Sequence, residues 1–237
     1  MMVAVASWVW TYGYDYLARA WLGGPFRVHE DALDAWLKGV AQCDSDLSGD
    51  IADTVRSLDD SVELESATHD FQNCIALPLP GLYVPPYASF WLDPSKLLWT
   101  TVTRQVLSWY NDAGLDWSNQ AASRSIVSAP DHLGIECAFA AELWAGSAIG
   151  GSADVSLASP TDRAGSTGPA ALTLDTVAVE ILRPVFIGGH MPSWVPLYAK
   201  ELRNRVTSNY WRGMADILER WVDLNALELL PAAGITS

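Results

Sequence analysis

Cysteine is scarce in this sequence. Cys43, Cys74 and Cys137 are the three cysteines among 237 residues, and no two of them form a CxxC pair. An odd number of widely spaced cysteines fits neither a disulfide framework nor the usual spacing of a structural zinc site. We therefore expect a protein of the reducing cytoplasm.

Basic residues are also few. The chain has 14 Lys and Arg against 28 Asp and Glu, which gives a formal net charge of -14. Because this charge repels phosphate backbones, we expect no nucleic acid among its partners. The same charge favours cationic ligands, and 12 Trp and 8 Tyr supply apolar surface with polar tips that would line a peptide-binding groove. The alternative is that most of these aromatic side chains belong to the core.

Several motifs of enzymes and of membrane proteins are missing. The sequence contains no GxxxxGK[ST], GxGxxG, GxSxG or HExxH stretch, so it offers no local signature of the corresponding nucleotide, serine-hydrolase or zinc chemistry. The apolar start, residues 1–19, has no basic region and no small-residue cleavage site, and tyrosines and an aspartate interrupt it. We interpret it as a core helix of a soluble protein without stable membrane insertion.

What the sequence does have is helical periodicity. Apolar residues recur at spacings of three and four, whereas alternating strand patterns are weak. Glycine and proline mark the ends of most of these stretches. Helices are predicted for residues 2–21, 29–43, 47–58, 62–75, from Pro94 to before Gly114, from Pro130 to near Gly146, 172–186, 197–206 and 208–227.

Prolines and small residues divide the chain. Four prolines disfavour regular helix within residues 76–93, and the corner at residues 188–196 is again rich in proline. Residues 146–170 are rich in Gly, Ser, Ala, Thr and Pro, which predicts a flexible loop. The expected fold is all-α, a bundle of about ten helices in two connected subdomains, residues 1–75 and 94–237, joined by the proline-rich loop 76–93.

The stretch "SAPDHLGIECAFAAELW" holds the most informative polar residues. Pro130 is predicted to be the first residue of a helix and Asp131 the second, where a carboxylate stabilises the positive end of the helix dipole. His132 and Glu136 are four residues apart and share a helix face, so His190 from another helix would complete a metal site of a helical enzyme. A buried structural hydrogen bond explains Glu136 equally well, because a carboxylate on an apolar face needs a polar partner.

Three motifs, taken in order, resemble one known family. "VPPYASFWLD" at residues 84–93 resembles a proline-proline-aromatic-x-Ser segment, "APDHLGIE" at 129–136 a Pro-Asp-His motif, and "HMPSWVPLY" at 190–198 a His-x-x-x-Trp corner that Tyr210 and Trp211 follow. These motifs are similar to those of the TorD, DmsD and NarJ group of cytoplasmic chaperones. The chain differs upstream, where "DFQNC" keeps only Phe71 of a Leu-Phe-x-Gly-Pro pattern.

The resemblance implies a function without catalysis. Members of the group are all-helical and bind the twin-arginine signal peptide of an apo-oxidoreductase of the DMSO, TMAO or nitrate reductase type, holding this client until its molybdenum cofactor is loaded. The implied partners are this leader and the catalytic subunit, the implied assembly is a monomer or a domain-swapped dimer, and no cofactor belongs to the chaperone itself. Guanine nucleotide binding is also associated with the group, although no phosphate-binding motif occurs here.

The resemblance also implies where the signal peptide binds. It assigns the proline loop and the Asp-His motif to leader binding, with Asp131 as a candidate acceptor for a client arginine. The implied signal-peptide-binding residues are Phe71, Pro85, Pro86, Tyr87, Ser89, Asp131, His132, Glu136, His190 and Trp194.

Overall fold

The computed structural model describes residues 5–115, 127, 129–146 and 176–229. In this part of the chain the regular elements are helices, and one isolated β-type pairing joins Tyr87 to His132. The predicted all-α class is thereby confirmed. The α-helices are α1 (Ser7–Gly23), α2 (Glu30–Val40), α3 (Ser45–Arg56), α4 (Ser61–Asp70), α5 (Ala88–Leu92), α6 (Thr101–Asp112), α8 (Leu133–Ala145), α9 (Thr176–Val185), α10 (Met191–Arg205) and α11 (Asn209–Leu229).

Several helices begin at side-chain caps that the sequence provides. The side chains of Asp44, Asp60 and Thr100 accept hydrogen bonds from backbone amides in the first turns of α3, α4 and α6. Such caps satisfy amides that have no partner inside the helix, and each stabilises a helix by about 1 kcal/mol. The start of a helix is therefore fixed locally at these three places.

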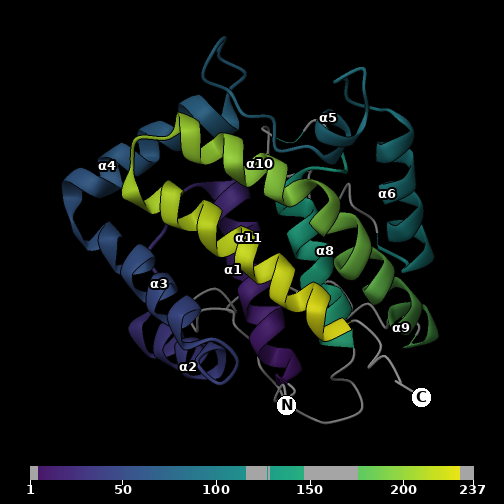
Figure 1. Ribbon diagram of the computed structural model, residues 1–237, viewed down its shortest axis with the longest axis horizontal. Helices are drawn as coiled ribbons and strands as arrows, with labels where there is room; N and C mark the ends of the chain where they lie inside the picture. The colour runs from purple at the N-terminus through teal and green to yellow at the C-terminus, as the bar shows by residue number, and fades with distance from the viewer. Residues whose placement is uncertain (1–4, 116–126, 128, 147–175, 230–237) are drawn as a thin grey trace, which may run out of the picture.

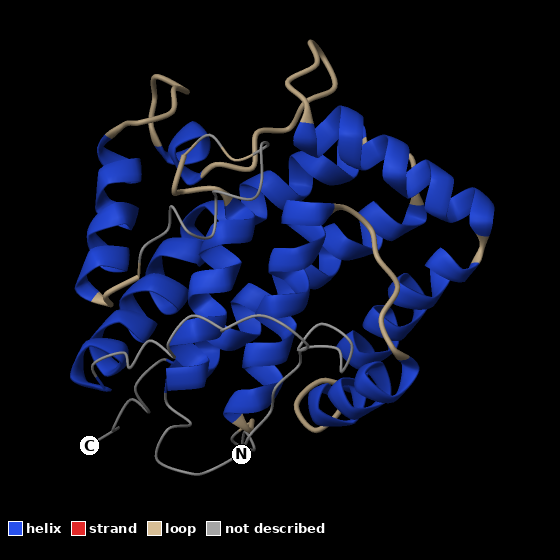
Figure 2. Cartoon of the chain, turned by 180° about the vertical axis from the view of Figure 1, so that it is seen from behind, coloured by secondary structure: helices blue, strands red, loops and turns tan. Residues whose placement is uncertain are grey.

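The centre of the molecule is the packing of α1 against α8. Figure 1 shows these two helices behind the antiparallel pair α10 and α11, with α2, α3 and α4 on one side and α5, α6 and α9 on the other. Figure 2 shows α1 and α8 from the opposite side, again between the flanking helices. Close approach requires glycine at position 134, because a Cβ there would lie 2.5 Å from Cγ of Leu22.

Most of the largest side chains belong to this core. One hydrophobic cluster includes residues from both predicted subdomains, and Trp36 of α2 meets Trp221 of α11 with ring centroids 5.7 Å apart. The division into two subdomains stays a prediction. Many of the aromatic side chains belong to the core, as the second of the two expectations for them stated. Six tryptophans are fully buried: Trp10, Trp21, Trp36, Trp194, Trp211 and Trp221.

The proline-rich segment differs from its prediction. It contains the short helix α5, which begins at Ala88, two residues after the last proline of the segment, so the restriction by proline ends at Pro86. Pro94, by contrast, opens no helix. Asp93 accepts hydrogen bonds from the amide and hydroxyl of Ser95, Lys96 takes a left-handed backbone with φ 57°, and α6 starts only at Thr101.

The predicted corner at residues 188–196 was wrong. The chain stays helical from Thr176 to Arg205, because a π-helical segment, Phe186–His190, connects α9 to α10. Pro184 lies inside α9 just before this wider turn, and Pro192 and Pro196 lie within α10, so the helix continues through these prolines. The predicted flexible loop 146–170 lies outside the described residues except for Gly146.

Candidate functional site

The proline loop is held against the start of α8 by backbone hydrogen bonds. The amide of Leu133 donates to the carbonyl of Pro86 at 2.7 Å, and the amide of Ala88 donates to the carbonyl of Asp131 at 3.0 Å. These bonds accompany the antiparallel pairing of Tyr87 with His132. Two of the sequence motifs, 45 residues apart, therefore form one structural unit.

Asp131 joins the two segments with its side chain. Its Oδ2 accepts a hydrogen bond from the amide of Ser89 at 2.7 Å, and both residues are fully buried. The other carboxylate oxygen, Oδ1, and the Ser89 hydroxyl have no hydrogen-bond partner among the described residues. In this arrangement the Asp131 carboxylate supports the backbone at the start of α5 and does not reach the surface.

The predicted start of α8 was wrong by three residues. The helix begins at Leu133 and not at Pro130, because residues 131 and 132 take part in the pairing with the proline loop. His132 is the cap, and its Nδ1 accepts a hydrogen bond from the amide of Gly134 at 3.1 Å. Its ring meets that of Tyr87 edge-on, with centroids 5.1 Å apart. Asp131 is therefore no residue of the first helical turn.

Glu136 has the polar partners that its buried position requires. Its Oε1 lies 2.9 Å from Nε2 of His190, and its Oε2 accepts a hydrogen bond from Nε1 of Trp194 at 3.2 Å. Burial raises the pKa of the Glu136 carboxyl, His190 opposes this rise, and the negative charge of Asp131 adds to it. The structure thus brings Glu136, His190 and Trp194 together from α8 and the junction of α9 with α10.

The alternative of a metal site on His132, Glu136 and His190 is not supported by the geometry. His132 uses Nδ1 to cap α8, while Glu136 and His190 bind each other. Among the described residues, no group of three or more His, Cys, Asp or Glu side chains is placed to hold a metal ion. The expected structural hydrogen bond of Glu136 is present instead.

The remaining predicted residues lie in different surroundings. Pro86 and Tyr87 are buried, and Pro85 is half-buried with its carbonyl accepting from Nε1 of Trp91 at 2.9 Å. Phe71 lies apart from the Asp131 unit. It is stacked on Trp211 of α11, with centroids 5.9 Å apart and an interplanar angle of 15°. Phe71 therefore belongs to the packing of the π-helical segment Phe71–Ala76 against α11.

Tyr110 also supports this unit, although it was not among the predicted residues. It is fully buried on α6, and its hydroxyl donates to the carbonyl of Pro130 at 3.0 Å. Burial, followed by the charges of Glu136 and Asp131, raises its pKa well above the usual value. Its place in the apolar periodicity of residues 101–112 was the available signal, but this signal identifies a core residue and not its hydrogen bond.

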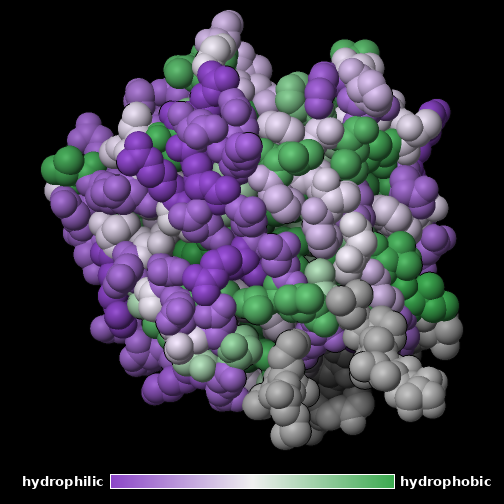
Figure 3. Space-filling view, in the orientation of Figure 1, coloured by the Kyte–Doolittle hydropathy of each residue, from purple (hydrophilic) through white to green (hydrophobic). Residues whose placement is uncertain are grey.

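Two loops on either side of α5 expose apolar side chains. Leu77, Leu79 and Leu82 precede α5, whereas Leu97 and Trp99 follow it, and each is between 37% and 63% exposed. Figures 1 and 2 show both loops projecting from the same end of the molecule. We call these five residues the apolar end. In Figure 3 hydrophobic residues gather on the side of α5, α6 and α9, whereas hydrophilic residues cover α3, α4 and α11.

Residues 41–161, about half of the chain, match the family model of the nitrate reductase delta subunit. The chain belongs to this family. The match includes the proline loop, Asp131 and Glu136, but not His190 or Trp194. The family is one of chaperones that act in the maturation of molybdenum enzymes, with the catalytic subunit as the partner. Neither the curated proteins nor the solved structures provide a match.

Within the described helices, none combines the length and hydropathy that a membrane span requires.

Proposed function

We propose that this protein is a cytoplasmic chaperone that binds the twin-arginine signal peptide of a molybdopterin oxidoreductase of the DMSO, TMAO or nitrate reductase type. It holds the apo-enzyme during cofactor loading and catalyses no reaction itself. Membership of the nitrate reductase delta family carries this proposal. The finer assignment, from a maturation chaperone to a leader-binding one, rests on the motifs that surround the proline loop.

We propose the apolar end as the surface for the apolar stretch of the leader. Isolated exposed leucines are common, but five large apolar side chains on two loops at the same end of the molecule (Figures 1 and 2) favour a binding surface. Two of the loop residues, Lys96 and Trp99, have left-handed backbones with φ 57° and 60°. Such conformations cost free energy in non-glycine residues and recur where a loop contacts a ligand.

The buried predicted residues act, in this proposal, by positioning the loop. Asp131, Ser89 and His132 fix the chain between Pro86 and α5, and the guanidinium of Arg205 donates to the carbonyl of Gly81. A loop fixed at both ends loses less conformational entropy when a peptide binds to it. The leader therefore contacts the exposed part of the loop, while the Asp-His motif keeps that part in place.

The first test is titration of a synthetic twin-arginine leader, followed by calorimetry, into wild type and a Leu82→Ser, Leu97→Ser double variant. Leu82 is 45% exposed and Leu97 is 63% exposed, so each has area left to bury, and each loss is expected to cost about 1 kcal/mol, or roughly fivefold in affinity. Val62→Ser is the matched control, because Val62 is 72% exposed on α4. Equal affinity of all variants would contradict the assigned surface, and no binding by wild type would contradict the leader-binding function.

A second test identifies the client. The tagged full-length chain is expected to capture the catalytic subunit of a molybdopterin oxidoreductase from an extract of cells that lack the cofactor. Capture should decrease when the leader is deleted from that subunit. If capture does not depend on the leader, the protein would still be a maturation chaperone, but recognition through the signal peptide would be contradicted.

A further inference from the structure

A second exposed surface follows α9, the π-helical segment Phe186–His190 and α10. The chain is helical throughout this region, and its exposed and half-exposed residues come in pairs every four positions, so they form one continuous stripe. Three large apolar side chains belong to it: Ile181 is 61% exposed, Val185 47% and Leu197 49%. We call the stripe from Ile181 to Leu197 the uncharged stripe. Its other members are Pro184, Gly188, Gly189, Pro192, Ser193 and Pro196.

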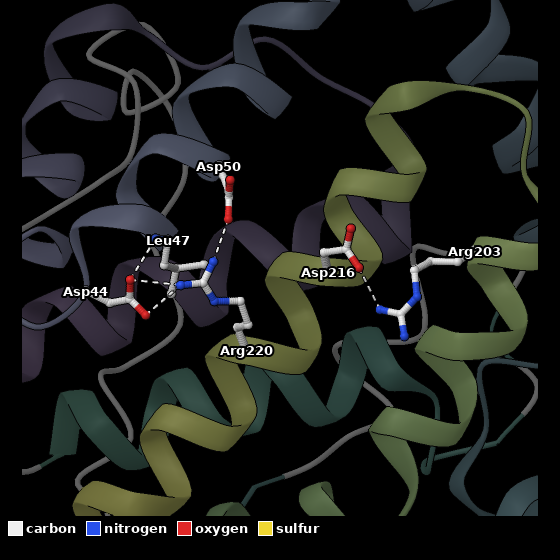
Figure 4. Close-up of polar contacts among 6 residues, drawn as sticks. All are labelled: Asp44, Leu47, Asp50, Arg203, Asp216 and Arg220. Atoms are coloured by element: carbon white, nitrogen blue, oxygen red, sulfur yellow. Dashed lines mark hydrogen bonds and ion pairs between the residues drawn. The ribbon is translucent and has the colours of Figure 1, made fainter.

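The uncharged stripe differs from the other exposed helix faces in its lack of charge. The two ionisable residues in this part of the chain, Arg183 and His190, are both buried. Figure 4 shows the contrast on α11, whose Arg220 and Asp216 form ion pairs with carboxylates near α3 and with Arg203 of α10. On a chain with a net charge of -14, another acidic molecule meets little repulsion where it contacts this stripe.

The two glycines of the stripe are not required by the packing of the chain itself. A Cβ on Gly189 would have the Pro184 carbonyl oxygen as its nearest packing neighbour, at 3.9 Å, and one on Gly188 would lie 3.8 Å from Cβ of Leu229, which are ordinary contacts. Neither glycine has a left-handed backbone. Since alanine would fit at both positions and favour the helix, glycine lowers stability here without an internal reason. What glycine provides is space for another backbone to approach closely from outside.

The two ends of the stripe carry opposite charges. Glu180 directly precedes Ile181, and Lys200 lies one turn beyond Leu197, with both charged residues exposed. The Glu180 side chain is 64% exposed and lies 3.7 Å from the buried Arg183. Lys200 forms no ion pair with any residue that the structure describes. Both charges are therefore available to a partner that covers the stripe.

We propose that the uncharged stripe is the interface of a homodimer, in which it packs antiparallel on the same stripe of a second copy. A two-fold axis through Gly189 places Ile181 of one copy opposite Leu197 of the other, since each is eight residues from this glycine. The same axis brings Glu180 near Lys200 of the second copy, because these residues are nine and eleven positions from Gly189. Figure 1 shows α9 and α10 meeting end to end, so the axis exchanges these two helices.

This order of residues favours a second copy over an unrelated apolar segment. The apolar side chains, the glycines and the opposite end charges are all arranged symmetrically about one position, which is what an isologous interface requires. A ridge of this length is about 30 Å long and covers less than the roughly 800 Å² per partner of a standard interface. We therefore expect a weak dimer that forms at micromolar concentrations. Each chain keeps its own helices in it, and the inference goes beyond the proposed function because neither leader nor client is needed.

The first test measures the dimer dissociation constant by sedimentation velocity of the full-length chain at rising concentration. Gly189→Gln is expected to weaken the dimer about tenfold or more, because a side chain at the crossing point keeps the two helices apart. Gly49→Gln is the matched control, since Gly49 is an exposed glycine of α3 with open space around it. This control is expected to dimerise like wild type.

The second test uses the end charges. Glu180→Lys and Lys200→Glu are each expected to weaken the dimer about tenfold, because each variant replaces two attractive contacts by two repulsive ones. An equimolar mixture of the two variants is expected to dimerise with about wild-type affinity, since every end charge then meets an opposite one. Glu65→Lys on α4 makes the same charge change at an exposed position away from the stripe and is expected to have little effect.

The outcomes separate this interface from other kinds of association. Weaker dimers of the stripe variants, with recovery in the mixture, support the proposal. A wild type that stays monomeric, a dimer that Gly189→Gln leaves intact, or a mixture that does not recover overturns it. If wild type is monomeric and Gly189→Gln captures less of the catalytic subunit, the stripe contacts the client instead of a second copy. Circular dichroism confirms folding, and none of these results depends on leader binding.

Discussion

Burial of Asp131 changes the result expected from mutating it. Its carboxylate accepts the amide of Ser89 at 2.7 Å, so Asp131→Ala leaves that amide buried without a partner. Such a loss costs about 1 to 3 kcal/mol. For a protein of this length each 1 kcal/mol lowers Tm by about 2 to 4 °C, so a loss of 2 kcal/mol corresponds to about 4 to 8 °C.

Asp131→Asn is expected to behave differently. Its side-chain oxygen still accepts from Ser89, and its NH₂ group takes the place of Oδ1, which has no partner among the described residues. The exchange also removes a negative charge that raises the pKa of the neighbouring Glu136. We therefore expect a change in stability below about 1 kcal/mol.

The two variants distinguish positioning of the loop from direct contact with a client arginine. Thermal melts and leader titrations are measured on wild type, Asp131→Ala and Asp131→Asn. If Asp131 positions the loop, Asp131→Asn binds the leader within about twofold of wild type, whereas Asp131→Ala loses stability and affinity together. A tenfold to hundredfold loss of affinity in a fully stable Asp131→Asn variant, the size of a lost charge-assisted hydrogen bond, would refute the positioning role and favour the direct contact.

Further predictions concern Glu136 and the glycines. Because the folded-state pKa of Glu136 is raised, folding is favoured while this group is protonated and loses that contribution as pH rises above about 4.5 through the folded pKa. The Tm of Glu136→Gln minus that of wild type should therefore increase from pH 4.5 to pH 8 in thermal melts, and a difference that falls with pH would contradict the raised pKa. Gly134→Ala should lower the free energy of unfolding by about 1 to 3 kcal/mol in urea titrations, because the added Cβ would meet Leu22. Gly49→Ala in α3 is the control: there is open space around Gly49, so this change should raise the free energy of unfolding by about 0.5 to 1 kcal/mol. Equal changes in both glycine variants would contradict the close packing of α1 on α8.

Local patterns in the sequence predicted the helices well, since apolar spacing and capping residues act within a few residues of each other. The predicted last helix, 208–227, agrees with α11 (Asn209–Leu229). The start of α8 was wrong because the local preference of Pro130 competes with hydrogen bonds from the proline loop, 45 residues away. The sequence around Pro130 alone does not show that the proline loop forms these hydrogen bonds.

The candidate site was only partly visible in the sequence for the same reason. Glu136 on an apolar face indicated a buried polar partner, but the choice of His190 depends on the path of α9 and α10. Burial of Asp131 likewise depends on the proline loop that covers it.

The pairing of α1 with α8 has a consequence for synthesis on the ribosome. Helix α1 ends at Gly23 and its main partner ends at Ala145, so at about 5 to 20 residues per second the nascent chain waits about 6 to 24 s before that partner is complete. During this time the apolar side chains of α1, among them Trp10, Leu17 and Trp21, lack the neighbours that bury them in the finished fold. A chaperone with this topology is itself exposed to aggregation while it is being made, and any pause in translation between these two helices prolongs that exposure.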